Sequence, residues 1–158
     1  YYEREVLPHK NDDAINAKAM PGAHAALQAV QDAGLRCALF TNPSFPQGAI
    51  ECRMGWGELT DAPFELVTHM GNATRCKPDA TYYLEQLQVM GLEPHEVLMV
   101  GNDPKRDFPS PDCGIQTAYV GQGKPGRATW RGTMEDFARN FNAVVEAFYE
   151  HQVAEELS

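Results

Sequence analysis

Apolar residues along the chain alternate between two spacings. Three stretches place them three or four positions apart, as one face of an α-helix does: residues 23–33, 79–90 and 134–148. Between them lie continuously apolar runs of strand length: residues 35–40, 64–67, 97–100 and 117–120. We predict helices over the first set and strands over the second.

Helix ends are marked by glycines and by a capping motif. Gly34 and Gly91 stand where left-handed C-terminal caps belong. Thr133 to Asp136 resemble a capping box, which satisfies backbone N–H groups at a helix start. Two short helices and a loop rich in Gly and Arg complete the predicted pattern: residues 47–53, 107–113 and 121–132.

Short apolar strands that alternate with helices are typical of a parallel sheet covered on both faces. The pattern predicts an α/β protein with a Rossmann-like three-layer α/β/α core and a mostly parallel sheet. We expect residues 21–150 to form this core domain. Residues 1–20 are polar and contain no strand pattern, so we interpret them as a remnant of a cap or a linker. Residues 151–158 are predicted to be a C-terminal tail.

The net charge and the lengths of the apolar runs limit which partners the chain is expected to bind. The 158 residues carry a net charge of −9, from 13 Lys and Arg against 22 Asp and Glu. An acidic chain repels the phosphate backbone, so nucleic acid is not an expected partner. No apolar run approaches the roughly 18 residues of a membrane span, and no basic-then-apolar leader is present. We expect a cytoplasmic protein without a membrane partner.

The four cysteines form no C-x-x-C pair, and their wide spacing suits neither a zinc site nor a small disulfide framework. We interpret them as free thiols in a reducing compartment. His95-Glu96 does not extend to H-E-x-x-H, so the commonest zinc hydrolase motif is absent.

Polar residues follow three of the predicted strands. Thr41 and Asn42 come after the first strand, Lys77 closes the loop after the second, and Asp103 and Asp107 come after the third. In a doubly wound sheet, ligands bind beyond the carboxyl ends of the strands. Carboxylates there suit Mg²⁺, while an ammonium and a hydroxyl suit phosphoryl oxygens. The sequence therefore predicts an anion site beside a divalent cation.

Each of these residues has an ordinary structural reading. A threonine after a strand is usually a turn residue, and a lysine before proline is usually solvated. Asp103 and Asp107 also fit a helix N-cap and a surface acid. Their combined order on successive strand ends is what favours the functional interpretation.

Those segments resemble the haloacid dehalogenase superfamily in its second, third and fourth motifs. Thr41-Asn42, Lys77-Pro78 and Gly101-Asn102-Asp103 with Asp107 carry the resemblance. The longer stretches PGAHAALQAVQDAGLRCALFTNPSFP, RCKPDATYYLEQLQVMGLEPHEVLMVGNDPKRD and GIQTAYVG are also similar to phosphatase-like members. The resemblance covers residues 20–149.

The resemblance implies a Mg²⁺-dependent hydrolase of a small phosphorylated or other anionic substrate. In the family an aspartate attacks phosphorus, and water hydrolyses the resulting aspartyl-phosphate. By position, Thr41 and Asn42 would bind the phosphoryl group and Lys77 would neutralise its charge. Asp103 would be the metal ligand, and Asp107 would support Lys77 or the metal shell. We expect Thr41, Lys77 and Asp107 to be catalytic and Thr41, Asn42 and Lys77 to bind substrate.

The family's first motif, a strand ending in D-x-D-G-T, has no counterpart here. Asp12-Asp13-Ala14-Ile15 follows no apolar run and lacks the glycine. In the family this strand is central, and here it would lie between residues 35–40 and 97–100. We therefore expect another segment of the same protein to supply the strand and the nucleophile. Without it the chain would not be competent, and the strands at 35–40 and 97–100 would not pair with each other.

Three other interpretations account for part of the sequence. The first is a catalytically inactive binding or scaffolding module with the same fold. The second is a nucleotide-binding domain that uses residues 120–124, but no phosphate-loop motif is present there. The third is a phospho-receiver domain, whose strand-end residues come in a different order. The first remains the alternative to the hydrolase.

Overall fold

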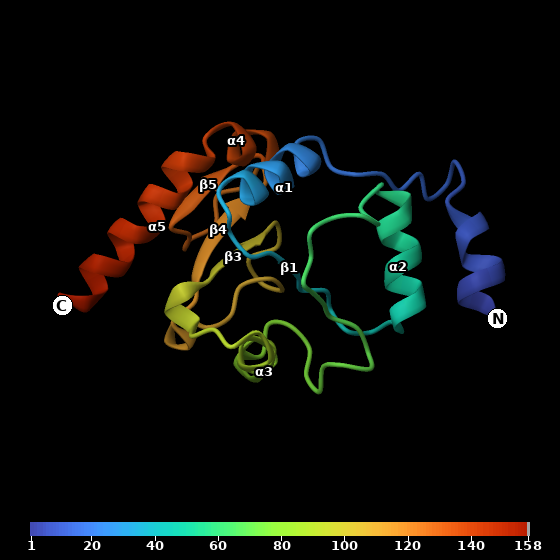
Figure 1. The fold of residues 1–158 in the computed structure, drawn as a ribbon, viewed down its shortest axis with the longest axis horizontal. Coiled ribbons are helices and arrows are strands. Elements are labelled where there is room, and N and C mark those ends of the chain that lie inside the picture. The colour runs from blue at the N-terminus through green and yellow to red at the C-terminus, as the bar shows by residue number, and fades with distance from the viewer. Residues whose placement is uncertain (158) are drawn as a thin grey trace.

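The computed structural model describes residues 1–157, with the side chains of residues 155 and 156 left out. Figure 1 shows the arrangement of its elements. The strands are β1 (Ala38–Leu39), β2 (Leu66–Val67), β3 (Leu98–Gly101), β4 (Gln116–Val120) and β5 (Trp130–Gly132). The α-helices are α1 (Ala23–Asp32), α2 (Gln47–Trp56), α3 (Ala80–Met90), α4 (Met134–Arg139) and α5 (Phe141–Glu156). The remaining turns are η1 (Tyr2–Val6), η2 (Leu7–Lys10), η3 (Pro94–Glu96) and η4 (Pro111–Cys113).

The strands form two parallel groups. One group pairs β1 with β2, with Ala38 opposite Leu66. The other has the order β3-β4-β5, with Leu98 opposite Gln116 and Ala118 opposite Trp130. Within residues 1–157 no hydrogen-bonded ladder joins the two groups, so β1 and β3 do not pair with each other. The predicted parallel α/β architecture is confirmed.

Two apolar clusters cover opposite faces of the strands. Side chains from α1, α4 and α5 meet Val100 and Val120 in one cluster, which includes Phe137 and Val144. Side chains from α3 meet Met99 and Phe40 in the other. Figure 1 shows α1 and α4 on one side of the strands and α3 on the other. Alternation along β3 therefore sends successive residues to different helical layers.

The helix predictions at 23–33 and 79–90 are confirmed by α1 and α3. Asp79 caps α3 by accepting a hydrogen bond from the Thr81 N–H at 2.8 Å. Gly91 ends α3 with φ at +66°, and Gly34 follows α1 with φ at +67°. Both positions need the left-handed backbone that glycine adopts without a steric cost.

Three local predictions are wrong. Residues 107–113 form no helix beyond the turn η4, because Pro109 and Pro111 lack an N–H and keep the preceding backbone extended. The predicted loop 121–132 ends in β5, whose three residues show little apolar pattern. The predicted single helix over 134–148 is two helices, α4 and α5, separated at Asn140.

Residues 2–10 form the helical turns η1 and η2, which lie beside α2 (Figure 1). The Glu3 carboxylate lies over Gly48 in the first turn of α2. None of the helices within residues 1–157 has the length and apolar character that crossing a bilayer requires.

The predicted capping box at the start of α4 is confirmed. The Thr133 hydroxyl accepts from the Asp136 N–H at 3.0 Å, and the Asp136 carboxylate accepts from the Thr133 N–H and hydroxyl. These hydrogen bonds from Thr133 lower the pKa of Asp136 below its ordinary 3.8. A group whose pKa is depressed by folding stabilises the folded state above its unfolded pKa, and loses that contribution as pH falls through the folded value.

We expect the free energy of unfolding of the wild type to fall as pH drops below about 4, and this fall to be shallower in Asp136→Asn. The amide cannot titrate, so one proton-linked contribution disappears. Urea unfolding followed by circular dichroism from pH 2 to pH 6 measures the free energy of unfolding of each protein. Asp32→Asn on α1, whose exposed side chain accepts a hydrogen bond from the Gln28 amide, serves as the control. Parallel curves for wild type and Asp136→Asn would contradict the prediction.

Candidate functional site

A largely enclosed ion pair joins two of the predicted catalytic residues. Lys77 Nζ lies 2.6 Å from Asp107 Oδ1, and the two side chains are only 10% and 14% exposed. Lys77 comes three residues before α3, and Asp107 lies in the loop that follows β3. The pair therefore sits beyond the carboxyl end of β3, where the sequence places the chemistry.

The loop after β3 wraps around the Asp107 carboxylate. Its Oδ2 accepts hydrogen bonds from the N–H groups of Asn102 and Asp103, at 3.1 and 2.9 Å. Gly101 allows this approach, because a Cβ there would lie 2.5 Å from Asp107 Cβ. Both carboxylate oxygens are thus committed to protein donors. Asp107 thus holds the Lys77 ammonium through one oxygen and two backbone N–H groups through the other.

The Asp103 carboxylate, unlike that of Asp107, is accessible to solvent. Its side chain is 43% exposed, and it accepts a hydrogen bond from the Lys105 N–H at 3.0 Å. Arg106 Nε lies 3.6 Å from its other oxygen, an exposed contact that contributes little stability. Asp103 is therefore the accessible carboxylate of this loop, and Asn102 beside it is also exposed.

Magnesium prefers several oxygen ligands in octahedral geometry. The described residues hold no cluster of three or more metal-ligating side chains. Asp103 and the Asn102 amide oxygen are donors of the right kind at this edge. They fit part of a magnesium site, which needs further oxygens to be complete.

Thr41 belongs to a separate hydrogen-bond network at the end of β1. Its N–H donates to Thr68 Oγ1 and its hydroxyl donates to the Thr68 carbonyl, both at 2.7 Å. Thr68 is fully buried just beyond β2. Asn42, which follows Thr41, is exposed. In this state the hydroxyl proton of Thr41 is held by the protein itself.

Two consecutive tyrosines of α3 lie between these networks, and sequence reasoning missed both as site residues. The Tyr82 phenol donates to the Thr41 carbonyl at 2.6 Å, and the Tyr83 phenol donates to the Asp107 carbonyl at 2.5 Å. Both residues are 0% exposed. Burial raises the pKa of both phenols above their ordinary value, so they stay protonated hydrogen-bond donors.

The structure thus brings Lys77, Asp103 and Asp107 together in one loop cluster. It links Thr41 to that cluster through α3. Helical spacing alone marks Tyr82 and Tyr83 as core positions. The available signal was that a phenol hydroxyl needs a partner when it is buried.

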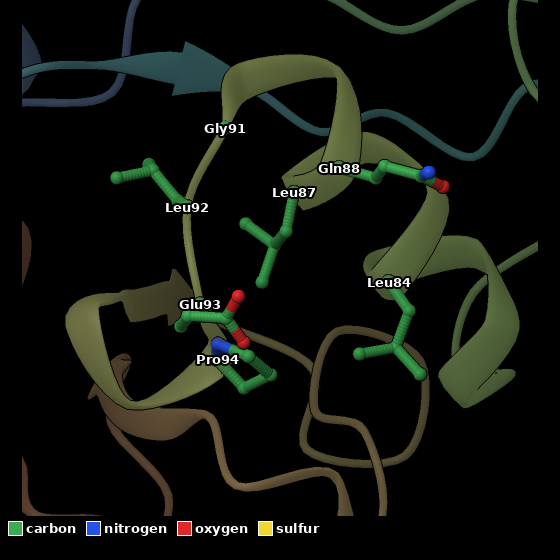
Figure 2. A pocket seen from close by; sticks show the side chains of 7 residues that line it. All are labelled: Leu84, Leu87, Gln88, Gly91, Leu92, Glu93 and Pro94. Atoms are coloured by element: carbon green, nitrogen blue, oxygen red, sulfur yellow. The ribbon is translucent and has the colours of Figure 1, made fainter.

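A shallow groove lies at the other end of α3. Figure 2 shows its lining side chains: Leu84, Leu87, Gln88, Gly91, Leu92, Glu93 and Pro94. This part of the chain leads into the amino end of β3, whereas Asp103 and Asp107 follow its carboxyl end. No predicted site residue lines the groove, so it is separate from the candidate site.

The loop rich in Gly and Arg at residues 121–132 is held by the protein itself. The Arg127 guanidinium donates to the Pro109 carbonyl at 2.6 Å and is held there. Gly123 N–H donates to the Tyr119 hydroxyl at 3.0 Å, which fixes the loop against β4. Residues 121–129 form a loop that leads into β5 rather than into a helix, in keeping with their interpretation as a surface loop.

The family model for haloacid dehalogenase-like hydrolases matches residues 4–110. These residues include every side chain of the candidate site. The chain belongs to the haloacid dehalogenase superfamily. Curated protein sequences contain no match to this haloacid dehalogenase-like chain.

Solved structures of the superfamily share the fold. A candidate beta-phosphoglucomutase from Thermotoga maritima matches 86% of this chain and 67% of its own length, with TM-score 0.70 and 20% identity. A beta-phosphoglucomutase from Clostridium difficile matches 85% of this chain and 58% of its own, with TM-score 0.68 and 16% identity. A haloacid dehalogenase phosphatase from Thermococcus onnurineus matches 77% of this chain and 57% of its own, with TM-score 0.64 and 20% identity. The present chain thus spans 57–67% of these superfamily members.

Proposed function

We propose that this chain contributes Lys77 and the other described site residues to a Mg²⁺-dependent phosphomonoester hydrolase. A further segment of the same protein would supply the nucleophilic aspartate. The observation that carries the proposal is the largely enclosed Lys77–Asp107 ion pair beyond the carboxyl end of β3. A buried ammonium fixed by a carboxylate is a preorganised positive charge, which stabilises phosphoryl oxygens strongly in a water-poor site.

The nucleophile would come from a strand between β1 and β3. Both strand groups are parallel, and each leaves one of these edges without a partner within residues 1–157. The residues of β4 are all buried, whereas Leu98, Met99 and Val100 of β3 are only half-buried. Unpaired backbone groups cost roughly 1–3 kcal/mol each when buried. A strand inserted there would pair both edges and end beside Thr41 and Lys77.

Each site residue then has a role. Lys77 would neutralise charge on the transferring phosphoryl group, and Asp107 would hold Lys77 in place. Thr41 and the Asn42 N–H would bind phosphoryl oxygens, which requires the Thr41 hydroxyl to turn away from the Thr68 carbonyl. Asp103 would hold Mg²⁺ with the Asn102 amide and oxygens of the further segment. The metal ion would supply positive charge that offsets the repulsion between carboxylates and phosphate.

The substrate class we propose is a small phosphorylated molecule. Support comes from the superfamily membership and from similar structures whose names include phosphatases and phosphoglucomutases. One similar structure, from Deinococcus radiodurans, holds phosphate and sodium. The anion-binding chemistry of Lys77 and Thr41 agrees with such a ligand.

A second candidate function is a non-catalytic binding module. The occupied Thr41 hydroxyl and the two committed oxygens of Asp107 favour it, because they leave few free groups for chemistry in the described chain. Such a module would bind phosphate without turnover.

Phosphate release by the full-length protein distinguishes the two functions. A panel of small phosphomonoesters is assayed with Mg²⁺ and with excess chelator. The hydrolase predicts turnover that chelation abolishes and that Mg²⁺ restores. Absence of turnover on every substrate, together with saturable binding of inorganic phosphate, would overturn the hydrolase in favour of the module.

A further inference from the structure

Two buried hydroxyls on one helix reach both halves of the candidate site. Tyr82 and Tyr83 are adjacent in α3, and their phenols donate to the Thr41 carbonyl and the Asp107 carbonyl respectively. Lys77 lies just before the same helix. A single rigid element therefore holds Thr41, Lys77 and Asp107.

The aromatic packing around the pair leaves little freedom. The two tyrosine rings meet edge to face, with centroids 5.1 Å apart. The Phe40 ring, directly before Thr41, packs on Tyr82 at 5.8 Å and on Tyr83 at 6.3 Å. Phenylalanine at both positions would fill the same apolar space. The contribution of the two hydroxyls is therefore their hydrogen bonds to the backbone carbonyls rather than packing.

Tyr82 and Tyr83 together form a bridge between the loops after β1 and β3, which no strand pairing connects in the described part of the chain. Within residues 1–157 no backbone ladder connects β1 with β3. Within these residues the separation between the loop after β1 and the loop after β3 is therefore set by side chains and helices. The proposed inserted strand would add a backbone connection to the one that the tyrosines make. Tyr82 also lies 2.9 Å from Thr68 Oγ1, so it ties in the end of β2 as well.

We propose that Tyr82 and Tyr83 are positioning residues that hold the Thr41 half and the Lys77–Asp107 half of the site at a fixed separation. This inference rests on the proposed phosphohydrolase function for its catalytic readout. Misplacement of catalytic groups by about 1 Å costs as much as 100-fold in rate. Because one bridge needs both of its ends, breaking either end releases the same constraint.

The test compares Tyr82→Phe, Tyr83→Phe and the double variant in the full-length protein. Each single change is expected to lower kcat about tenfold and leave KM within about twofold, because the bound substrate is held by other groups. The double variant is expected to lose about tenfold to twentyfold rather than the product of about 100-fold. Losses that multiply, or an unchanged kcat, would overturn the shared bridge and leave two independent structural hydroxyls.

Tyr119→Phe is the matched control. It removes a buried phenol hydroxyl that accepts one backbone hydrogen bond, from Gly123, and joins no two parts of the site. We expect it to lower Tm as much as the α3 variants do while leaving kcat unchanged.

Amide hydrogen exchange supplies a readout that does not depend on catalysis. Tyr82→Phe is expected to speed exchange at Asn102 and Asp103, across the site, as well as at Thr41. Tyr83→Phe should do the same at Thr41, and Tyr119→Phe at none of them. Exchange that changes only in the loop beside each variant would refute the bridge. If the protein hydrolyses no phosphomonoester, the proposed function fails while this exchange pattern still decides the inference.

Discussion

Replacing Lys77 with alanine is expected to lower phosphatase kcat of the full-length protein by at least about 100-fold, the typical loss when a preorganised charge is removed from a transition state. The lysine side chain is only 10% exposed, and Asp107 fixes its ammonium at 2.6 Å. Among the described residues no other lysine forms an ion pair with a carboxylate. Initial rates of phosphate release with saturating Mg²⁺ measure the loss.

The same substitution should reduce stability, because it leaves Asp107 buried without its counter-charge. Removal of one partner from a buried pair typically costs about 3–5 kcal/mol. Lys77→Ala with Asp107→Ala should therefore be less destabilised than the two single changes add up to. Lys18→Ala, at an exposed position outside the site, is the control and should leave rate and stability unchanged. Activity of Lys77→Ala near the wild-type level would contradict the assigned role.

Gly101→Ala is expected to disrupt the site by steric means alone. The new Cβ would lie 2.5 Å from Asp107 Cβ and 2.8 Å from its Oδ2. To relieve the clash the carboxylate must move, which weakens its bonds to Lys77 and to the Asn102 and Asp103 N–H groups. Overpacking of this kind costs about 1–3 kcal/mol. We expect that loss in urea unfolding and a kcat at least about tenfold lower.

Gly126→Ala provides the matched control. A Cβ at Gly126 meets nothing within 4 Å, and its backbone does not have a positive φ. Its unfolding free energy should stay within about 0.5 kcal/mol of the wild type. Equal behaviour of the two alanine variants would show that the tight approach at Gly101 does not hold the Asp107 carboxylate.

The sequence predicted the elements whose signals are local. Apolar spacing identified α1 and α3, and their glycine stops fixed the ends to within a residue or two. Strand positions were also correct, but the predicted run 35–40 contracts to Ala38–Leu39. Strand residues are defined by their backbone hydrogen bonds to a neighbouring strand. The described chain offers β1 such a neighbour on one edge only.

Failures occurred where long-range contacts decide the structure. β5 has almost no apolar pattern and forms because it pairs with β4. For the site, strand-end reasoning brought Lys77, Asp103 and Asp107 to one edge, as the structure has them. It could not separate the enclosed Asp107 from the exposed Asp103, because that depends on how the loop closes around one carboxylate. Nor could it find Tyr82 and Tyr83, whose role depends on which carbonyls lie opposite their hydroxyls.

The denaturing intact mass and N-terminal sequence of the purified native protein test the central claim most directly. That claim is a nucleophile carried by a strand outside residues 1–158. We predict a mass well above 17.5 kDa, or a second fragment that co-purifies, with an apolar run that ends in D-x-D in the added sequence. A single species of 17.5 kDa that begins at Tyr1 would contradict the claim and leave a phosphate-binding module.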